Sequence, residues 1–325
     1  MLETLLFYSL AVITGFVLLI WGAERFVVGA ANTAFNLGVT PLVIGLTIVS
    51  LGTSAPEFIV ATMASLDGKP GLAIGNAIGS NIANISLILA TTAIILPITV
   101  RRGIVSRELP LLMLVTFITI LLLWDQTLSR FDGVLLLLGM VVTLSWIVRH
   151  ARQQPEEEIK KEFNIELSRK MSTKKAILLL LFSILLLLIS SRILVWGAVG
   201  FAKFFGVSDL VIGLTVIAVG TSLPELAASI AAAWKNHHEL VLGNLIGSNI
   251  FNMLGVLAIP GLIDPGPVAP EVVSRDLPFM TVLTIAMFIA AYSFGHHQGR
   301  ISRLEGSVFL ASFLGYLVYL YHTAV

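Results

Sequence analysis

Two acidic residues, Glu57 and Glu225, lie deep within long apolar stretches, whereas most of the 19 acidic residues fall in loops or near the ends of such stretches. An ionised carboxylate in an apolar surrounding costs several kcal/mol unless it is paired or binds a cation. No Lys, Arg or His lies in the deep part of either segment to act as a partner. The pattern therefore predicts a cation-binding site, with a structural ion pair as the alternative.

Polar residues precede each glutamate at helical spacing. Ser50, Thr53 and Ser54 stand before Glu57 at positions that share one face of a helix. The second segment repeats this spacing, with alanine in the first position: Ala218, Thr221, Ser222 and Glu225. Each segment thus predicts a row of oxygen ligands on one helix face.

A proline directly before each glutamate should interrupt the helix. Pro56 and Pro224 have no N–H to donate to the carbonyl four residues back, which belongs to Gly52 and Gly220. Irregular backbone at membrane depth is tolerated only where it lines a cavity. We therefore expect a broken helix in each half, with freed carbonyl oxygens that could coordinate cations.

A second polar face follows in each half. Asn76, Ser80 and Asn84 recur every four residues. The second half has the same pattern in Asn244, Ser248 and Asn252. Amide and hydroxyl oxygens are hard neutral ligands that suit Na⁺ and Ca²⁺. Neighbouring Gly-x-x-x-Gly spacings leave the alternative, above all for Asn76 and Asn244, that the amides serve only as hydrogen bonds between helices.

The types of donor narrow the class of ion. The chain has no cysteine and no histidine near these segments, so Zn²⁺ and Cu⁺ are disfavoured. Two carboxylates with hydroxyl, amide and carbonyl oxygens form an all-oxygen cage whose charge balances one Ca²⁺. The same oxygens could instead hold Na⁺ at adjacent positions. Mutually exclusive occupancy by the two ions would produce an antiporter.

The composition places these segments in a membrane. Hydrophobic residues make up 57% of the 325 residues and charged residues only 12%, against about 25% charged in soluble proteins. The net charge of +1 suggests no nucleic-acid partner. The first apolar stretch follows an acidic start and lacks a cleavage site, so we interpret it as a span and not a signal peptide. Ten stretches can span a bilayer: 4–23, 40–66, 71–97, 109–124, 131–149, 176–200, 208–234, 240–263, 276–294 and 304–322.

The two halves of the chain repeat each other at a constant offset of 168 residues. Residues 45–58 and 213–226 are identical at eight of 14 positions, and residues 75–84 and 243–252 at eight of 10. Five spans in each half put the second half into the membrane from the opposite side. We therefore expect an all-α integral membrane protein of ten transmembrane helices, arranged as two inverted five-helix repeats with broken central helices. The predicted units are repeat one (1–148), a cytoplasmic linker (149–175) and repeat two (176–325).

Basic residues predict the orientation in the cell membrane. Fifteen of the 20 Lys and Arg residues fall on the side that holds the linker and five on the other. Because basic residues are enriched in cytoplasmic loops, the linker should be cytoplasmic and both termini should lie outside.

These motifs resemble those of the Ca²⁺/cation antiporter superfamily. The chain looks most like the prokaryotic Na⁺/Ca²⁺ exchanger branch, including its bacterial inner-membrane proteins. The resemblance rests on two Gly-Thr-Ser-x-Pro-Glu blocks and two Gly-Asn-x-Ile-Gly-Ser-Asn blocks at one fixed offset, and it covers essentially the whole chain.

The resemblance implies a ligand set and a mobile part. The first and sixth helices of this family slide over the remaining eight. Both glutamates would ligate Ca²⁺, and the backbone carbonyls of Ser50 and Ala218 would complete the Na⁺ sites. Some members carry Asp where this chain has Asn252, which makes K⁺ dependence less expected here. The implied side-chain ligands are Thr53, Ser54, Glu57, Ser80 and Asn84, with Thr221, Ser222, Glu225, Ser248 and Asn252.

We expect a Na⁺/Ca²⁺ antiporter and not an enzyme, without a cofactor and without an obligate protein partner, in contact with the lipid bilayer. Ca²⁺/H⁺ exchange is the alternative within the superfamily. H⁺ exchangers of this superfamily typically carry an acid where Gly79 and Gly247 stand here. A cation channel is the alternative from another class, and a membrane-embedded enzyme is disfavoured because no nucleophile–base or His-x-x-x-His constellation occurs.

Overall fold

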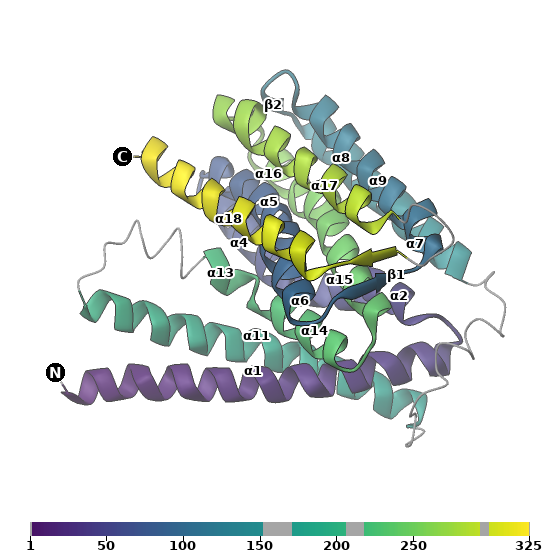
Figure 1. Ribbon diagram of the computed structural model, residues 1–325. Helices are drawn as coiled ribbons and strands as arrows, with labels where there is room; N and C mark the ends of the chain where they lie inside the picture. The colour runs from purple at the N-terminus through teal and green to yellow at the C-terminus, as the bar shows by residue number, and fades with distance from the viewer. Residues whose placement is uncertain (1, 152–170, 206–217, 293–298, 325) are drawn as a thin grey trace.

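The computed structural model describes residues 2–151, 171–205, 218–292 and 299–324. It is a mostly helical bundle with two small two-stranded sheets (Figure 1). Within these residues, eight helices are long and apolar enough to cross a membrane, or up to nine if one bent pair counts as a single span. The seventh predicted stretch, 208–234, begins outside the described residues.

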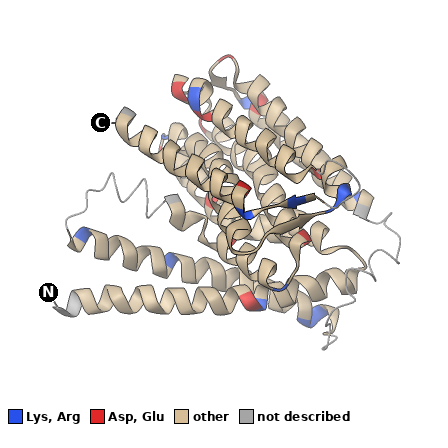
Figure 2. Ribbon diagram, in the orientation of Figure 1, with Lys and Arg blue, Asp and Glu red and all other residues tan. Residues whose placement is uncertain are grey.

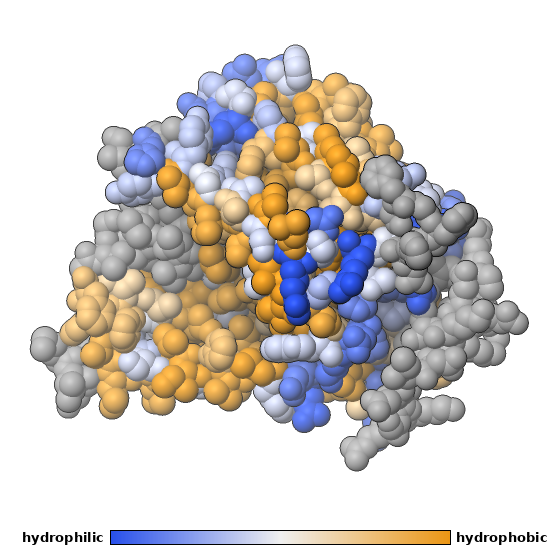
Figure 3. All heavy atoms as spheres, viewed as in Figure 1, coloured by the Kyte–Doolittle hydropathy of each residue, from blue (hydrophilic) through white to orange (hydrophobic). Residues whose placement is uncertain are grey.

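The two longest helices, α1 (Leu2–Leu37) and α11 (Thr173–Phe204), lie side by side along one flank of the bundle (Figure 1). They run antiparallel, because Gly15 packs against Leu194 and Gly29 against Leu180. An added Cβ at Gly15 would lie 2.7 Å from the backbone nitrogen of Leu194, so glycine permits this close approach. Apolar side chains cover the left part of this flank in Figure 3, as contact with lipid requires.

A broken helix follows in each half, and both breaks precede a proline. In the first half the two arms are bent by 43° at Ser54, whose ψ of 6° departs from helix geometry. In the second half Ser222 has the same conformation, with ψ 5°. The predicted interruption is thus found before both Pro56 and Pro224. The segments are α2 (Pro41–Ile44), the π-helix η1 (Gly45–Val49), α3 (Ser50–Thr53) and α4 (Ala55–Leu66), with α13 (Ala218–Thr221) and α14 (Leu223–Trp234).

The most buried spans are Pro70–Ile95 and His238–Ile263. Each contains a π-helical turn in its middle, and these turns begin at Asn84 and Asn252, which are 168 residues apart. Such turns are rare and are frequently found at functional sites. The first span comprises α5 (Pro70–Ala83), η2 (Asn84–Leu89) and α6 (Ala90–Ile95); the second comprises α15 (His238–Phe251), η4 (Asn252–Val256) and α16 (Ala258–Ile263).

Outer helices complete each half. Two of them begin with the same capping arrangement, in which the backbone N–H and the hydroxyl of a serine donate hydrogen bonds to the carboxylate three residues later. Ser129 donates to Asp132, and Ser302 donates to Glu305. Charged residues gather mostly at helix ends and in loops (Figure 2). The outer elements are α7 (Arg102–Ser106), α8 (Glu108–Leu123) and α9 (Arg130–Ala151), with the π-helix η5 (Val272–Asp276), α17 (Leu277–Ala291) and α18 (Arg303–Ala324).

Two antiparallel sheets join loops from different halves. Strand β1 (Ile98–Val100) pairs with β4 (Gly299–Ile301), and β2 (Thr127–Leu128) pairs with β3 (Gly266–Pro267). Each pair joins loops that the alternation of spans predicts on the same side of the membrane. The salt bridge between Arg101 and Glu239, at 2.8 Å, ties a third loop to the β1 side.

Candidate cation site

Glu57 and Glu225 occupy equivalent places, each in the first turn of the helix that follows a break. Both side chains are buried, with 1% of each residue exposed. The free N–H groups and dipole of a helix N-terminus stabilise a nearby negative charge. In the part of the chain that the structure describes, neither carboxylate forms a salt bridge. The break therefore supplies some of the compensation that a basic partner would otherwise give.

The carboxylates are brought together across the two halves. The Ser54 hydroxyl donates to Oε1 of Glu225 at 3.4 Å, and the Ser80 hydroxyl donates to Oε1 of Glu57 at 3.4 Å. Ser54 stands three residues before Glu57, so its bond brings Glu225 to the helix turn that carries Glu57. Residues predicted from separate blocks of sequence thus meet in one place. Their assignment to an ion stays a prediction.

Several side-chain oxygens around the carboxylates have no hydrogen-bond partner among the described residues. A buried polar atom without a partner is costly unless it meets water or an ion. Carboxylate, hydroxyl and amide oxygens are all represented, and no described group of three or more His, Cys, Asp and Glu side chains accompanies them. The oxygens are Oε2 of Glu57 and Glu225, Oγ of Ser222 and Ser248, and Oδ1 of Asn81 and Asn252.

The remaining predicted ligands lie close by in sequence and structure. Thr53 ends α3 and Thr221 ends α13, each directly before the break. The carbonyl of Ser50 already accepts the Ser54 N–H at 2.9 Å, although a carbonyl oxygen has a second lone pair to offer. Ala218 is the first residue of α13.

Two residues that the pattern did not single out, Asn81 and Asn249, join the halves. The Asn84 side-chain amide donates to Oδ1 of Asn249 at 2.9 Å, and that of Asn81 donates to the backbone carbonyl of Asn249 at 3.2 Å. The spacing of four residues that defined the polar face includes Ser80 and Ser248 and therefore leaves out Asn81 and Asn249, which directly follow them. The signal that could have found them is the Gly-Ser-Asn tripeptide, which both halves contain.

Asn76 and Asn244 form hydrogen bonds to residues of other helices. This is the alternative role that the sequence left open for them. The Thr53 hydroxyl donates to Oδ1 of Asn244 at 3.0 Å, and the Asn244 amide donates to Oγ of Ser229 at 3.4 Å. The Asn76 amide donates to the backbone carbonyl of Glu57 at 3.2 Å. Both amides therefore position predicted ligands.

One of the two carbonyls released by proline has a partner. The Ser191 hydroxyl of α11 donates to the Gly220 carbonyl at 2.9 Å. At Gly220 a hydroxyl from another helix thus replaces the hydrogen bond that Pro224 cannot donate, and the coordination of a cation by the freed carbonyls stays a prediction.

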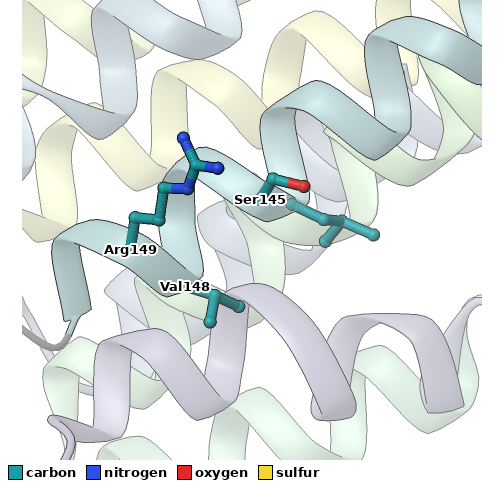
Figure 4. A pocket seen from close by; sticks show the side chains of 4 residues that line it. Ser145, Val148 and Arg149 are labelled. Atoms are coloured by element: carbon teal, nitrogen blue, oxygen red, sulfur yellow. The ribbon is translucent and has the colours of Figure 1, made fainter.

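Two cavities lie away from the carboxylates. One, of about 400 Å³, is lined by residues near the end of α9, among them Ser145, Val148 and Arg149 (Figure 4). The other, of about 600 Å³, lies between α8 and α9. The lining of neither cavity includes a predicted ligand.

The chain is similar to known membrane transport proteins over most of its length. The family model for sodium/calcium exchanger protein matches residues 7–149 and 175–322. CaxA of Alkalimonas amylolytica, described as a candidate antiporter, is 46% identical over 95% of this chain and 97% of its own length. The inner membrane protein YrbG of Escherichia coli is 41% identical over 89% of this chain and 90% of its own. The solved structure of the sodium-calcium exchanger NCX_Mj, soaked with 10 mM Na⁺ and zero Ca²⁺, matches with a TM-score of 0.83 at 33% identity, over 97% of this chain and 99% of that chain.

Proposed function

Because the chain belongs to the sodium/calcium exchanger family, we propose that it is a secondary active antiporter that exchanges Na⁺ for Ca²⁺ by alternating access at one mid-membrane site. The observation that carries this proposal is the meeting of Glu57 and Glu225, both buried and neither in a salt bridge within the described residues. A pair of buried negative charges is stable only with a cation or protons to balance it.

The proposed site is built from oxygen atoms of both halves. Hard cations such as Ca²⁺ take six to eight oxygen ligands, of which carboxylates supply the charge. The unpartnered oxygens of Glu57, Glu225, Ser222, Ser248 and Asn252 support the assignment. The full set consists of the side chains of Thr53, Ser54, Glu57, Ser80, Asn84, Thr221, Ser222, Glu225, Ser248 and Asn252, with the carbonyls of Ser50 and Ala218.

Exchange follows if Ca²⁺ and Na⁺ compete for these oxygens. One Ca²⁺ placed between the two carboxylates would balance both charges. Na⁺ ions at adjacent positions would use the same carboxylates with different hydroxyl and carbonyl oxygens. Since the site cannot hold both sets at once, loading with one ion on one side requires release of the other, which couples the two flows.

The architecture proposed for this cycle is two inverted repeats of five helices, 1–148 and 176–325, joined by the linker 149–175. The sheets support it. Strand β1 and strand β3 follow equivalent spans at an offset of 168, and each pairs with the strand that precedes the last helix of the other half. A two-fold axis in the membrane plane would produce this exchange of partners.

The proposed orientation has the linker in the cytoplasm and both termini outside. It is supported by the 15-to-five division of basic residues between the two predicted sides. A reporter fused after Val325 should be active outside the cytoplasm, and the same reporter placed in the linker should be active inside. The reverse result would reject this orientation.

Transport by the purified protein in proteoliposomes tests the function. Radioactive Ca²⁺ uptake should require an outward Na⁺ gradient and should not be driven by a K⁺ or pH gradient. Uptake driven by the pH gradient alone would establish Ca²⁺/H⁺ exchange instead. Single-channel currents in a planar bilayer would show a channel. An Asp67→Asn variant, altered at an exposed loop carboxylate, is the matched control for substitutions at the buried glutamates.

A further inference from the structure

A groove runs between α8 and α9. A cavity of about 600 Å³ lies between them, a volume within the range of small-molecule sites. Its lining is apolar apart from one end, with Leu111, Ile118 and Leu122 from α8 and Val142 from α9. We propose that this groove binds a single anionic phospholipid, with an acyl chain between the helices and the phosphate headgroup at Arg107.

The groove has the shape of an acyl-chain site. Its α8 lining runs from Arg107 to Leu122, which is about 22 Å at the rise of an α-helix. One leaflet of the hydrocarbon core is about 15 Å thick, so the groove accommodates a whole chain. The walls remain exposed, at 54% for Leu114 and 67% for Val142, whereas Leu136 on the floor is 1% exposed. Exposed apolar walls over a buried floor are open to lipid from the side.

The charge at the mouth of the groove favours a phospholipid with an anionic headgroup. Arg107, at the start of α8, is exposed and lines the mouth. Its sequence neighbour Glu108 is half-buried and its Oε2 is out of contact with solvent, so Arg107 is the charged side chain that lines the mouth. Trp146, whose ring is tilted against that of His150 with centroids 4.4 Å apart, lines the same end. Tryptophan is enriched at the membrane interface, the depth at which a headgroup would lie.

The floor of the groove connects it to the candidate cation site. Leu254 lines the groove and belongs to η4, the π-helical turn that begins at Asn252. Behind it, Gly255 packs against Phe58, the residue after Glu57. A chain in the groove would therefore press on the backbone that carries one predicted ligand. Lipid binding itself does not depend on the exchange activity, but an effect on ion affinity would rest on the proposed site.

Two adjacent residues of similar exposure allow a matched experiment. Val142 lines the groove and is 67% exposed, whereas Val141 is 56% exposed and does not line it. Native mass spectrometry of the purified protein, titrated with phosphatidylglycerol or phosphatidylcholine, should detect one tightly held phosphatidylglycerol. Val142→Trp should remove it and Val141→Trp should not. Arg107→Gln should weaken phosphatidylglycerol about fivefold, as expected for one basic residue at an anionic surface, whereas Arg130→Gln should have no effect.

The outcomes separate the possible occupants. Equal retention of phosphatidylglycerol by Val142→Trp and Val141→Trp would overturn the proposal. So would equal affinity for the two lipids in the unchanged protein. If Val142→Trp instead converted a dimer to a monomer in light scattering, with lipid retention unchanged, the groove would be an interface between two copies. Because none of these measurements needs transport, their failure would leave the antiporter proposal intact.

Discussion

The Ser191 hydroxyl donates a hydrogen bond to the carbonyl oxygen of Gly220 at 2.9 Å. This bond joins α11 to the broken helix of the second half, at the carbonyl that Pro224 cannot satisfy. At the equivalent place in the first half, 168 residues earlier, α1 has Ala23. The two halves therefore hold their broken helices differently, although the motifs around the glutamates are nearly the same.

Ser191→Ala should weaken apparent Ca²⁺ affinity by about tenfold at most. The substitution leaves a buried carbonyl without its partner, which costs about 1–3 kcal/mol, and only part of that cost should reach the adjacent predicted ligands Thr221 and Ser222. Ser191→Thr should restore the affinity. The concentration dependence of Ca²⁺ uptake measures the effect.

Ser190→Ala is the control for that measurement. Its hydroxyl donates within its own helix, to the Leu187 carbonyl at 3.1 Å, so its loss should leave uptake unchanged. If both alanine variants shifted the affinity equally, the bond to Gly220 would have no separate role.

Glu57→Gln and Glu225→Gln should each reduce Ca²⁺ uptake at least about hundredfold. Each change removes one of two negative charges and leaves a buried cation only half compensated, a loss of about 3–5 kcal/mol in comparable buried pairs. Both variants should still fold, because the amide has the same shape and the neighbouring helix contacts remain. Uptake near that of the Asp67→Asn control in either variant would remove the glutamate from the proposed site.

Much of the fold could be predicted because its causes are local. Pro56 and Pro224 set the breaks, and the apolar stretches set the spans. The length of α1 could not be obtained in this way. Its apolar stretch ends before Glu24, yet the helix continues to Leu37. Arg25 lies over the Trp21 ring, 5.6 Å from its centroid, and the Asn36 amide donates to the Met171 carbonyl. Polar residues with such contacts allow a helix to continue past the end of its apolar stretch.

The residues of the candidate site follow from the sequence as a prediction, whereas the contacts between them do not. Inverted symmetry suggests equal roles for Asn76 and Asn244, yet one donates to the Glu57 backbone and the other accepts from Thr53. The π-helical turns at Asn84 and Asn252 have no sequence signature. Such features depend on how the halves pack against each other, which no single segment specifies.

Asn84 and Asn249 should be energetically coupled across the halves. Their bond of 2.9 Å is buried, so Asn249→Leu would leave the Asn84 amide without its acceptor. We expect each single variant, Asn84→Ala or Asn249→Leu, to lower the free energy of unfolding by about 1–3 kcal/mol. The double variant should lose less than the sum, with a coupling of about 0.5–3 kcal/mol for residues in contact. Thermal unfolding in detergent compares the unchanged protein with the two single variants and the double variant. If the losses of the two single variants simply add up in the double variant, Asn84 and Asn249 are not coupled.

Asn252→Asp should make transport more dependent on pH between about 5 and 8, because three crowded carboxylates cannot readily all ionise. The Oδ1 atom of Asn252 is buried and without a partner among the described residues, at the start of η4. An added carboxylate there would share the field of Glu57 and Glu225, and one of the three groups would take up a proton whenever the site holds no cation. As the pH falls, protons then compete with Ca²⁺ more strongly than in the unchanged protein, so uptake should decline at a higher pH. The equivalent Asn84→Asp is the matched comparison, since the Asn84 amide donates to Asn249 and its replacement also breaks that bond. Na⁺-driven Ca²⁺ uptake measured across this pH range decides the matter. Superimposable profiles for Asn252→Asp and the unchanged protein would mean that Asn252 lies outside the field of the two glutamates and does not belong to the site.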